Sequence, residues 1–184
     1  MTILPSSRTY AFWLALVRIV TGVIWIAHGV PKFTNASQFM PPSGAMAGFL
    51  DKAVTSSTGG YHTFLTTVVV PNIGLFAELV RLGEVLVGVS LVFGAATRLG
   101  GLVGVVLALN YIFAKGNVLS TSTLQGLDVA MLVLSAINLL LPTGRALGVD
   151  AAFIRSRRPS APVAIRAEFV PEPPLDRPTA PPEP

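Results

Sequence analysis

A carboxylate, Glu84, lies in the middle of an apolar segment that is long enough to cross a lipid bilayer. The segment runs from about Gly74 to Ala96 and also holds Glu78 and Arg81. A charge at membrane depth costs roughly 2.5–3.5 kcal/mol, so such residues usually pair, face the interior of a helix bundle and have a function. The sequence therefore predicts a membrane protein with a polar interior.

Composition supports this prediction and excludes several kinds of site. The chain of 184 residues is 52% hydrophobic and 12% charged, whereas a soluble domain usually carries about 25% charged residues. It has no cysteine, which excludes thiolate metal sites and iron–sulfur clusters. Its two histidines do not match the ligand spacing of a metal site, so no metal is expected. The sequence has no basic stripe with interleaved aromatic residues, so nucleic acid is not expected as a partner.

Four apolar segments predict an all-α membrane protein, a four-transmembrane-helix bundle with a long extracytoplasmic loop between helices one and two. The membrane domain is expected over 10–152, after a cytoplasmic leader at 1–9 and before a disordered cytoplasmic tail at 153–184 that is rich in Pro and Arg. Within the loop, short helices are expected at 45–54 and 61–70. The four long helices are expected at about 10–31, 72–95, 99–114 and 124–141.

The distribution of basic residues predicts the orientation of this bundle. Four spans place both termini on one side of the membrane, and the flanking basic residues divide six to three between the two sides. Because the cytoplasmic side carries the excess of Lys and Arg, we expect both termini in the cytoplasm of a multi-pass protein of the cell membrane. The expected cytoplasmic residues are Arg8, Arg98, Arg145, Arg155, Arg157 and Arg158, and the others are Lys32, Lys52 and Lys115.

The rise of 1.5 Å per residue allows the depth of each polar residue to be estimated. Arg18, Glu84, Asn110 and Ser135 fall near the midplane, and we expect Arg18 to pair with Glu84. A second level, nearer the outer face, holds His28, Glu78, Arg81 and Asp128. Two alternatives stay open: Arg81 is three residues from both Glu78 and Glu84 and could pair within its own helix, and Asp128 could serve the dipole of its helix.

Two further patterns predict how the helices pack. Arg18, Thr21, Trp25, His28 and Lys32 recur at intervals of three or four residues, so they share one face of the first helix, which should point into the bundle. Small residues at similar spacing predict close approach between helices. These are Gly83 and Gly88 on the second helix, and Gly100, Gly104 and Ala108 on the third.

Several motifs resemble a known family. Leu16-Val17-Arg18-Ile19-Val20-Thr21-Gly22 with Trp25, His28-Gly29 and Lys32-Phe33, and Leu82-Gly83-Glu84-Val85-Leu86-Val87-Gly88 followed by Thr97-Arg98, resemble DoxX-like proteins. Gly144-Arg145-Ala146-Leu147-Gly148-Val149-Asp150 is similar to the DoxD branch, the small-subunit type of thiosulfate:quinone oxidoreductase. The likeness covers about residues 10–152. It implies a four-helix membrane protein, linked in some members to quinone-coupled sulfur oxidation or to redox-stress complexes. The matching positions are Arg18, His28, Lys32, Glu84 and Arg98.

The first functional hypothesis is a quinone-associated or redox-complex membrane subunit, with no cofactor motif of its own and with quinone as the expected ligand. Glu84, Arg18 and His28 would form a proton and charge network. Arg81, Trp25, Asn110 and Tyr111 would form the quinone pocket. Electron transfer would then need a partner redox subunit or a bound quinone.

The alternative is a non-enzymatic membrane scaffold or assembly subunit, in which the interior ion pair only fixes helix register. Its basic tail would contact anionic lipid or a cytoplasmic partner, and a homo-oligomer fits either hypothesis. A small-solute transporter is less favoured, because four helices without a repeat offer little for alternating access.

Overall fold

The computed structural model describes residues 7–116, 126–145 and 148–151, and every regular element within these ranges is helical. The all-α class is therefore confirmed. The predictions for the tail at 153–184, with Arg155, Arg157 and Arg158, and for most of the leader at 1–9 lie outside the described residues.

Four long helices occupy the positions that the sequence predicts. Two stretches, Thr9–Thr34 and Thr97–Ala114, are long and apolar enough to cross a membrane. Helix α6 is 21 residues long but carries Glu78, Arg81 and Glu84, and α9 has only 14 residues. That all four helices span the membrane thus stays a prediction. Their bounds are Ser7–Gly29 (α1), Ile73–Phe93 (α6), Thr97–Ala114 (α7) and Leu127–Leu140 (α9).

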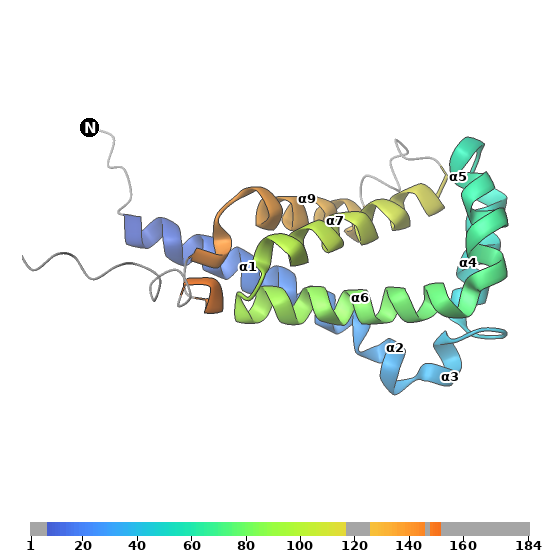
Figure 1. Cartoon of the computed structure of the whole chain (residues 1–184), viewed down its shortest axis with the longest axis horizontal. Coiled ribbons are helices and arrows are strands. Elements are labelled where there is room, and N and C mark those ends of the chain that lie inside the picture. Colours follow the sequence, from blue (N-terminus) through green and yellow to red (C-terminus); the bar gives the residue numbers. More distant parts are fainter. Residues whose placement is uncertain (1–6, 117–125, 146–147, 152–184) are drawn as a thin grey trace, which may run out of the picture.

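The segment between α1 and α6 is mostly helical where the sequence predicted a long loop with two short helices. Helices α4 and α5 lie across one end of the bundle, steeply inclined to α6 (Figure 1). Leu50, Ala53, Leu65, Val69 and Ala114 form a buried apolar cluster there. The elements are α2 (Pro31–Thr34), α3 (Ala36–Phe39), α4 (Ala45–Ser56), α5 (Gly59–Phe64), the π-helix η1 (Leu65–Val69) and the 3-10 helix η2 (Val70–Asn72).

Glycines allow the long helices to pack as two close pairs. Between α1 and α6, a Cβ added to Gly22 would lie 2.8 Å from the carbonyl oxygen of Gly88. Between α7 and α9, a Cβ added to Gly101 would lie 2.6 Å from the backbone nitrogen of Leu139. Such contacts let backbones approach without intervening side chains. The predicted packing role therefore holds for Gly88, whereas Gly83 meets only the side chain of Leu107.

The turn between α6 and α7 is held by the segment that follows α9. Gly94 (φ 67°) and Ala96 (φ 51°) have left-handed backbone conformations in this turn. Ala96 is the N-cap residue of α7, and its methyl group cannot accept the hydrogen bonds that a helix N-terminus offers. Asp150 accepts them instead, from the backbone N–H of Ala96 (2.8 Å) and of Thr97 (3.1 Å), and from the Thr97 hydroxyl (3.0 Å). Two sequence motifs far apart in the chain thus meet at one end of the bundle.

Candidate functional site

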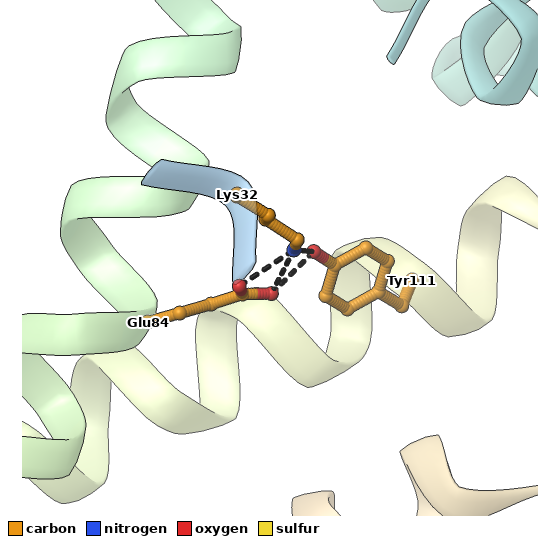
Figure 2. A network of polar contacts seen from close by, with 3 residues as sticks. All are labelled: Lys32, Glu84 and Tyr111. Atoms are coloured by element: carbon orange, nitrogen blue, oxygen red, sulfur yellow. Dashed lines mark hydrogen bonds and ion pairs between the residues drawn. The ribbon is translucent and has the colours of Figure 1, made fainter. Parts of the chain in front are cut away.

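Three polar side chains from three helices meet inside the bundle (Figure 2). Lys32 Nζ, from α2, donates to both carboxylate oxygens of Glu84 on α6, at 2.5 Å each. The Tyr111 hydroxyl on α7 donates to Glu84 Oε1 (2.6 Å) and accepts from Lys32 Nζ (2.9 Å). Glu84 is 1% exposed and Lys32 is 19% exposed. The buried charge of Glu84 is therefore balanced by a cation that still reaches the surface.

Local sequence explains why Lys32 can reach this carboxylate. Helix α1 ends at Gly29, and Pro31 starts the short helix α2 that carries Lys32. Gly29 packs directly against α6, since a Cβ there would lie 3.0 Å from Glu84 Cβ. This close approach places the start of α2 beside the middle of α6, so a lysine three residues later extends over Glu84.

The cluster faces a cavity of about 180 Å³ between the two helix pairs. Trp25 forms part of its wall and is fixed there because its indole Nε1 donates to Ser135 Oγ on α9 (3.2 Å). His28 also lines the cavity but is exposed at the surface of α1. The complete lining is Trp25, His28, Lys32, Glu84, Ala108, Tyr111, Leu127, Asp128 and Met131.

A second ion pair stands beside this cavity. Lys115, just after α7, pairs with Asp128 in the first turn of α9, and their side chains are 41% and 24% exposed. Asp128 is thus both near the positive end of the α9 dipole, as one alternative predicted, and part of the cavity wall. The pair joins α7 to α9 at the same end of the bundle as Lys32.

The predicted pair of Arg18 and Glu84 is wrong. Arg18 Nη1 donates to the carbonyl oxygen of Thr143 (3.2 Å), and the guanidinium lies against Gly94 at the α6–α7 turn. Glu84 is ten residues from Gly94 along α6, which corresponds to about 15 Å. The depth estimate compared positions along the helix axes, whereas the long Arg side chain extends toward the nearer end of the bundle. Arg18 is therefore separate from the Glu84 cluster.

Arg18 instead belongs to a buried polar network at the other end of the bundle. Thr143 Oγ1 donates to Asn138 Oδ1 (3.0 Å), and Asn138 Nδ2 donates to Thr21 Oγ1 (3.4 Å). Arg18, Thr21, Asn138 and Thr143 are all 1% exposed or less. The predicted polar face of α1 thus points inward at Arg18, Thr21 and Trp25, whereas His28 is exposed, and the face contributes to two separate clusters.

Two residues of the predicted quinone pocket also lie elsewhere. Arg81 forms a bidentate ion pair with Glu78, as the alternative of pairing within one helix predicted, and its guanidinium lies 4.5 Å from the centre of the Phe33 ring. Asn110 Oδ1 accepts a hydrogen bond from the Tyr61 hydroxyl (2.8 Å). Burial raises the pKa of the Tyr61 phenol, which therefore keeps the proton that it donates. Neither Arg81 nor Asn110 lines the cavity.

Of the predicted site residues, the structure thus brings Trp25, His28, Glu84 and Tyr111 to one cavity. It adds Lys32, which was predicted to share the polar face of α1 but was not assigned to the site. The spacing of His28 and Lys32, four residues apart, was the signal for it. Nothing in the sequence placed Met131 beside them.

The arrangement is suited to proton transfer and hydrogen bonding. Lys32, Glu84 and Tyr111 form a closed set of short contacts through which a proton can be exchanged. Within the part of the chain that the structure describes, no group of three or more His, Cys, Asp or Glu side chains could hold a metal ion. The aromatic and aliphatic walls beside a few polar groups are typical of sites for flat organic ligands.

Comparison with known proteins gives one match. A family model described as "TQO small subunit DoxD" matches residues 13–163. The resemblance drawn from the sequence motifs is thereby confirmed, and the matched region includes every residue of the cavity. No curated protein and no solved structure matches the chain.

Proposed function

This chain belongs to the DoxD family, and from that premise we propose that its cavity binds the head group of a quinone in a membrane complex of the quinone oxidoreductase type. The observation that carries the proposal is the Lys32–Glu84–Tyr111 cluster at the wall of a cavity of about 180 Å³. Family membership suggests a membrane subunit of such a complex, and the cluster is what suggests where the quinone would bind.

The cavity has the two properties that a quinone ring requires. Trp25, Tyr111 and Met131 offer apolar and aromatic surface to the ring. Its two carbonyl oxygens need hydrogen-bond donors. His28 carries one, and Lys32 and Tyr111 would each exchange a hydrogen bond within the cluster for one to the ligand. His28 has no hydrogen bond to any other described residue, so its ring is free to donate to a ligand.

The charged cluster suits the proton chemistry of the reaction. Reduction of a quinone to a quinol takes up two electrons and two protons. A reduced sulfur compound, oxidised on a partner subunit, would supply the electrons. Tyr111 would give its hydroxyl proton to the ligand and recover one from protonated Glu84, and Lys32 would balance the charge of the carboxylate in the role first expected of Arg18. Arg81 and Asn110 are no longer needed in this pocket.

Quinone retention tests the proposal directly. The full chain is purified in mild detergent, and co-extracted quinones are quantified by mass spectrometry against protein. We expect near-stoichiometric quinone, reduced at least tenfold by Trp25→Leu combined with Tyr111→Leu. Phe12→Leu combined with Tyr10→Leu is the matched control, because both side chains are more than 50% exposed at the opposite end of α1. Equal retention in the two double variants, or none in the native chain, would reject the proposal.

Activity provides a second test. In proteoliposomes with a thiosulfate-oxidising partner fraction, Glu84→Gln should lower quinone reduction by at least tenfold. Glu78→Gln removes a carboxylate from the same helix outside the cavity and should retain activity. Unchanged turnover of Glu84→Gln would remove this residue from the reaction.

One observation favours the scaffold as a second candidate. The Glu78 side chain is 39% exposed although it belongs to the long apolar helix α6. A partner subunit that covered this face would shield the charge from lipid. Photo-crosslinking from position 79 (Leu79, 53% exposed) in native membranes should then capture a protein partner, whereas crosslinks to lipid alone would count against it.

The membrane topology also remains a proposal. We propose four spans in the cell membrane with both termini in the cytoplasm, supported by the apolar helices and by the bias of basic residues. Reporter fusions at residue 60 and at the C-terminus should be active on opposite sides of the membrane.

A further inference from the structure

We infer that the cavity exchanges water and protons with one side of the membrane only, the side on which α2, α4 and α5 lie. This inference rests on the proposed function, because the side of proton exchange has meaning only if the cavity serves a reaction that consumes protons. It adds to that function the direction from which the protons come.

Charged groups surround the cavity at its α2 end. Lys32 connects the buried carboxylate of Glu84 to the surface, and Lys115 and Asp128 form the neighbouring ion pair. The remaining titratable groups at the cavity are His28 and Tyr111. Charged side chains hold water around them, and Lys32 is in contact with both Glu84 and Tyr111. A continuous polar path therefore leads from the cavity to this end of the bundle.

The opposite end of the cavity is closed by an apolar layer. Trp25, Ala108 and Met131, which line the cavity, pack against Val87 and Leu91 in a buried cluster in which no side chain is more than 4% exposed, so Val87 and Leu91 form the layer behind the cavity wall. The Trp25 N–H donates to Ser135, and an indole can only donate, so it cannot pass a proton onward. The close contact of Gly22 with Gly88 on the same level leaves no room for water between α1 and α6. The Arg18 network lies beyond this layer.

The absence of native cysteine permits a test by site-directed labelling. Single-cysteine variants of the full chain in oriented proteoliposomes are exposed to a small, charged, membrane-impermeant methanethiosulfonate from either side. Lys52→Cys and Arg98→Cys, both at exposed positions, identify the two sides. Met131→Cys and Ala108→Cys report on the cavity, and Val87→Cys reports on the apolar layer.

We expect both cavity variants to react at least tenfold faster from the Lys52 side than from the Arg98 side, and Val87→Cys to react from neither. Equal or faster reaction from the Arg98 side would overturn the inference, as would reaction with a membrane-permeant reagent alone. Two cavity positions are used because one variant could fail to fold. Gel filtration identifies a variant that does not fold.

Labelling needs no quinone, so the inference and the proposed function can fail separately. Cavity labelling from the Lys52 side in a protein without quinone would reject the function and keep the access path. Quinone retention with labelling from the Arg98 side would do the reverse. If the inference and the proposed function both hold, a pH jump on the Lys52 side should change the rate of quinone reduction at once. A pH jump on the Arg98 side should not change it.

Discussion

Lys32 Nζ lies 2.5 Å from both carboxylate oxygens of Glu84, a residue 52 positions away in the sequence. The contact ties the short helix after α1 to the middle of α6. It also explains how a charge can remain inside an apolar bundle, because the Glu84 carboxylate is 1% exposed while the Lys32 side chain that neutralises it is 19% exposed.

Removing one member of the pair should lower the stability of the protein much more than removing both. Lys32→Met leaves a buried carboxylate without its cation, and we expect a loss of about 3 kcal/mol in the free energy of unfolding. Lys32→Met combined with Glu84→Leu should recover most of that loss, since no charge remains to be desolvated. Unfolding in mixed micelles measures both values, and a double variant less stable than Lys32→Met would contradict the prediction.

Tyr111→Phe should lower stability by about 1–2 kcal/mol, because Glu84 loses a hydrogen bond to its charged oxygen while the ring remains. Tyr10→Phe is the matched control, as this tyrosine is 52% exposed, and it should change the unfolding midpoint by little. Thermal unfolding followed by circular dichroism compares the two variants. Equal midpoints would show that the Tyr111 hydroxyl adds nothing to the cluster.

Gly88→Ala should destabilise the contact between α1 and α6. The new methyl group would lie 2.8 Å from the Gly22 carbonyl oxygen, so the helices must separate, at a cost of about 1–3 kcal/mol. The same change at Gly74, where an added Cβ has no neighbour within 4 Å, should be neutral or slightly stabilising because alanine favours helix. Unfolding of the two variants in detergent gives the comparison, and similar stability would refute close packing at Gly88.

Asp150→Ala should release the α6–α7 turn. The carboxylate accepts two backbone N–H groups and one hydroxyl, and hydrogen bonds to a charged group contribute about 1.5–3 kcal/mol. We expect faster amide hydrogen exchange at residues 94–98 and a similar loss of stability. Asp51→Ala, at an exposed position on α4, should alter neither quantity, and unchanged exchange at the turn in Asp150→Ala would contradict the predicted role.

The sequence was sufficient to predict where the long helices lie, but it predicted the contacts between side chains less well. Apolar length located α1, α6, α7 and α9, and proline and glycine marked the ends of the short helices. The position of Glu84 within α6 also indicated the centre of the site. These features depend on local composition and periodicity, which the sequence contains directly.

The partner of Glu84 could not be found in the same way. Axial depth favoured Arg18, but the direction of a long side chain depends on what surrounds it. Arg18 extends toward Thr143 and Gly94, and the short helix α2 carries Lys32 back over α6. The helix that positions Lys32 lies in a segment for which a loop was expected, so the spacing of His28 and Lys32 indicated a shared face but not that Lys32 would reach Glu84.

The glycine contacts limit how the bundle can move. Gly22 and Gly88 bring α1 against α6, and Gly101 brings α7 against α9, so we expect each pair to move as one unit. The α6–α7 turn, held by Asp150, connects the units at one end, and α6 and α7 diverge from it toward α4 (Figure 1). A wider cavity would then require one unit to rotate against the other about that turn, and a small angle there would become a large displacement at Lys32. The size of molecule that the bundle admits would thus be controlled from the end farthest from where it enters.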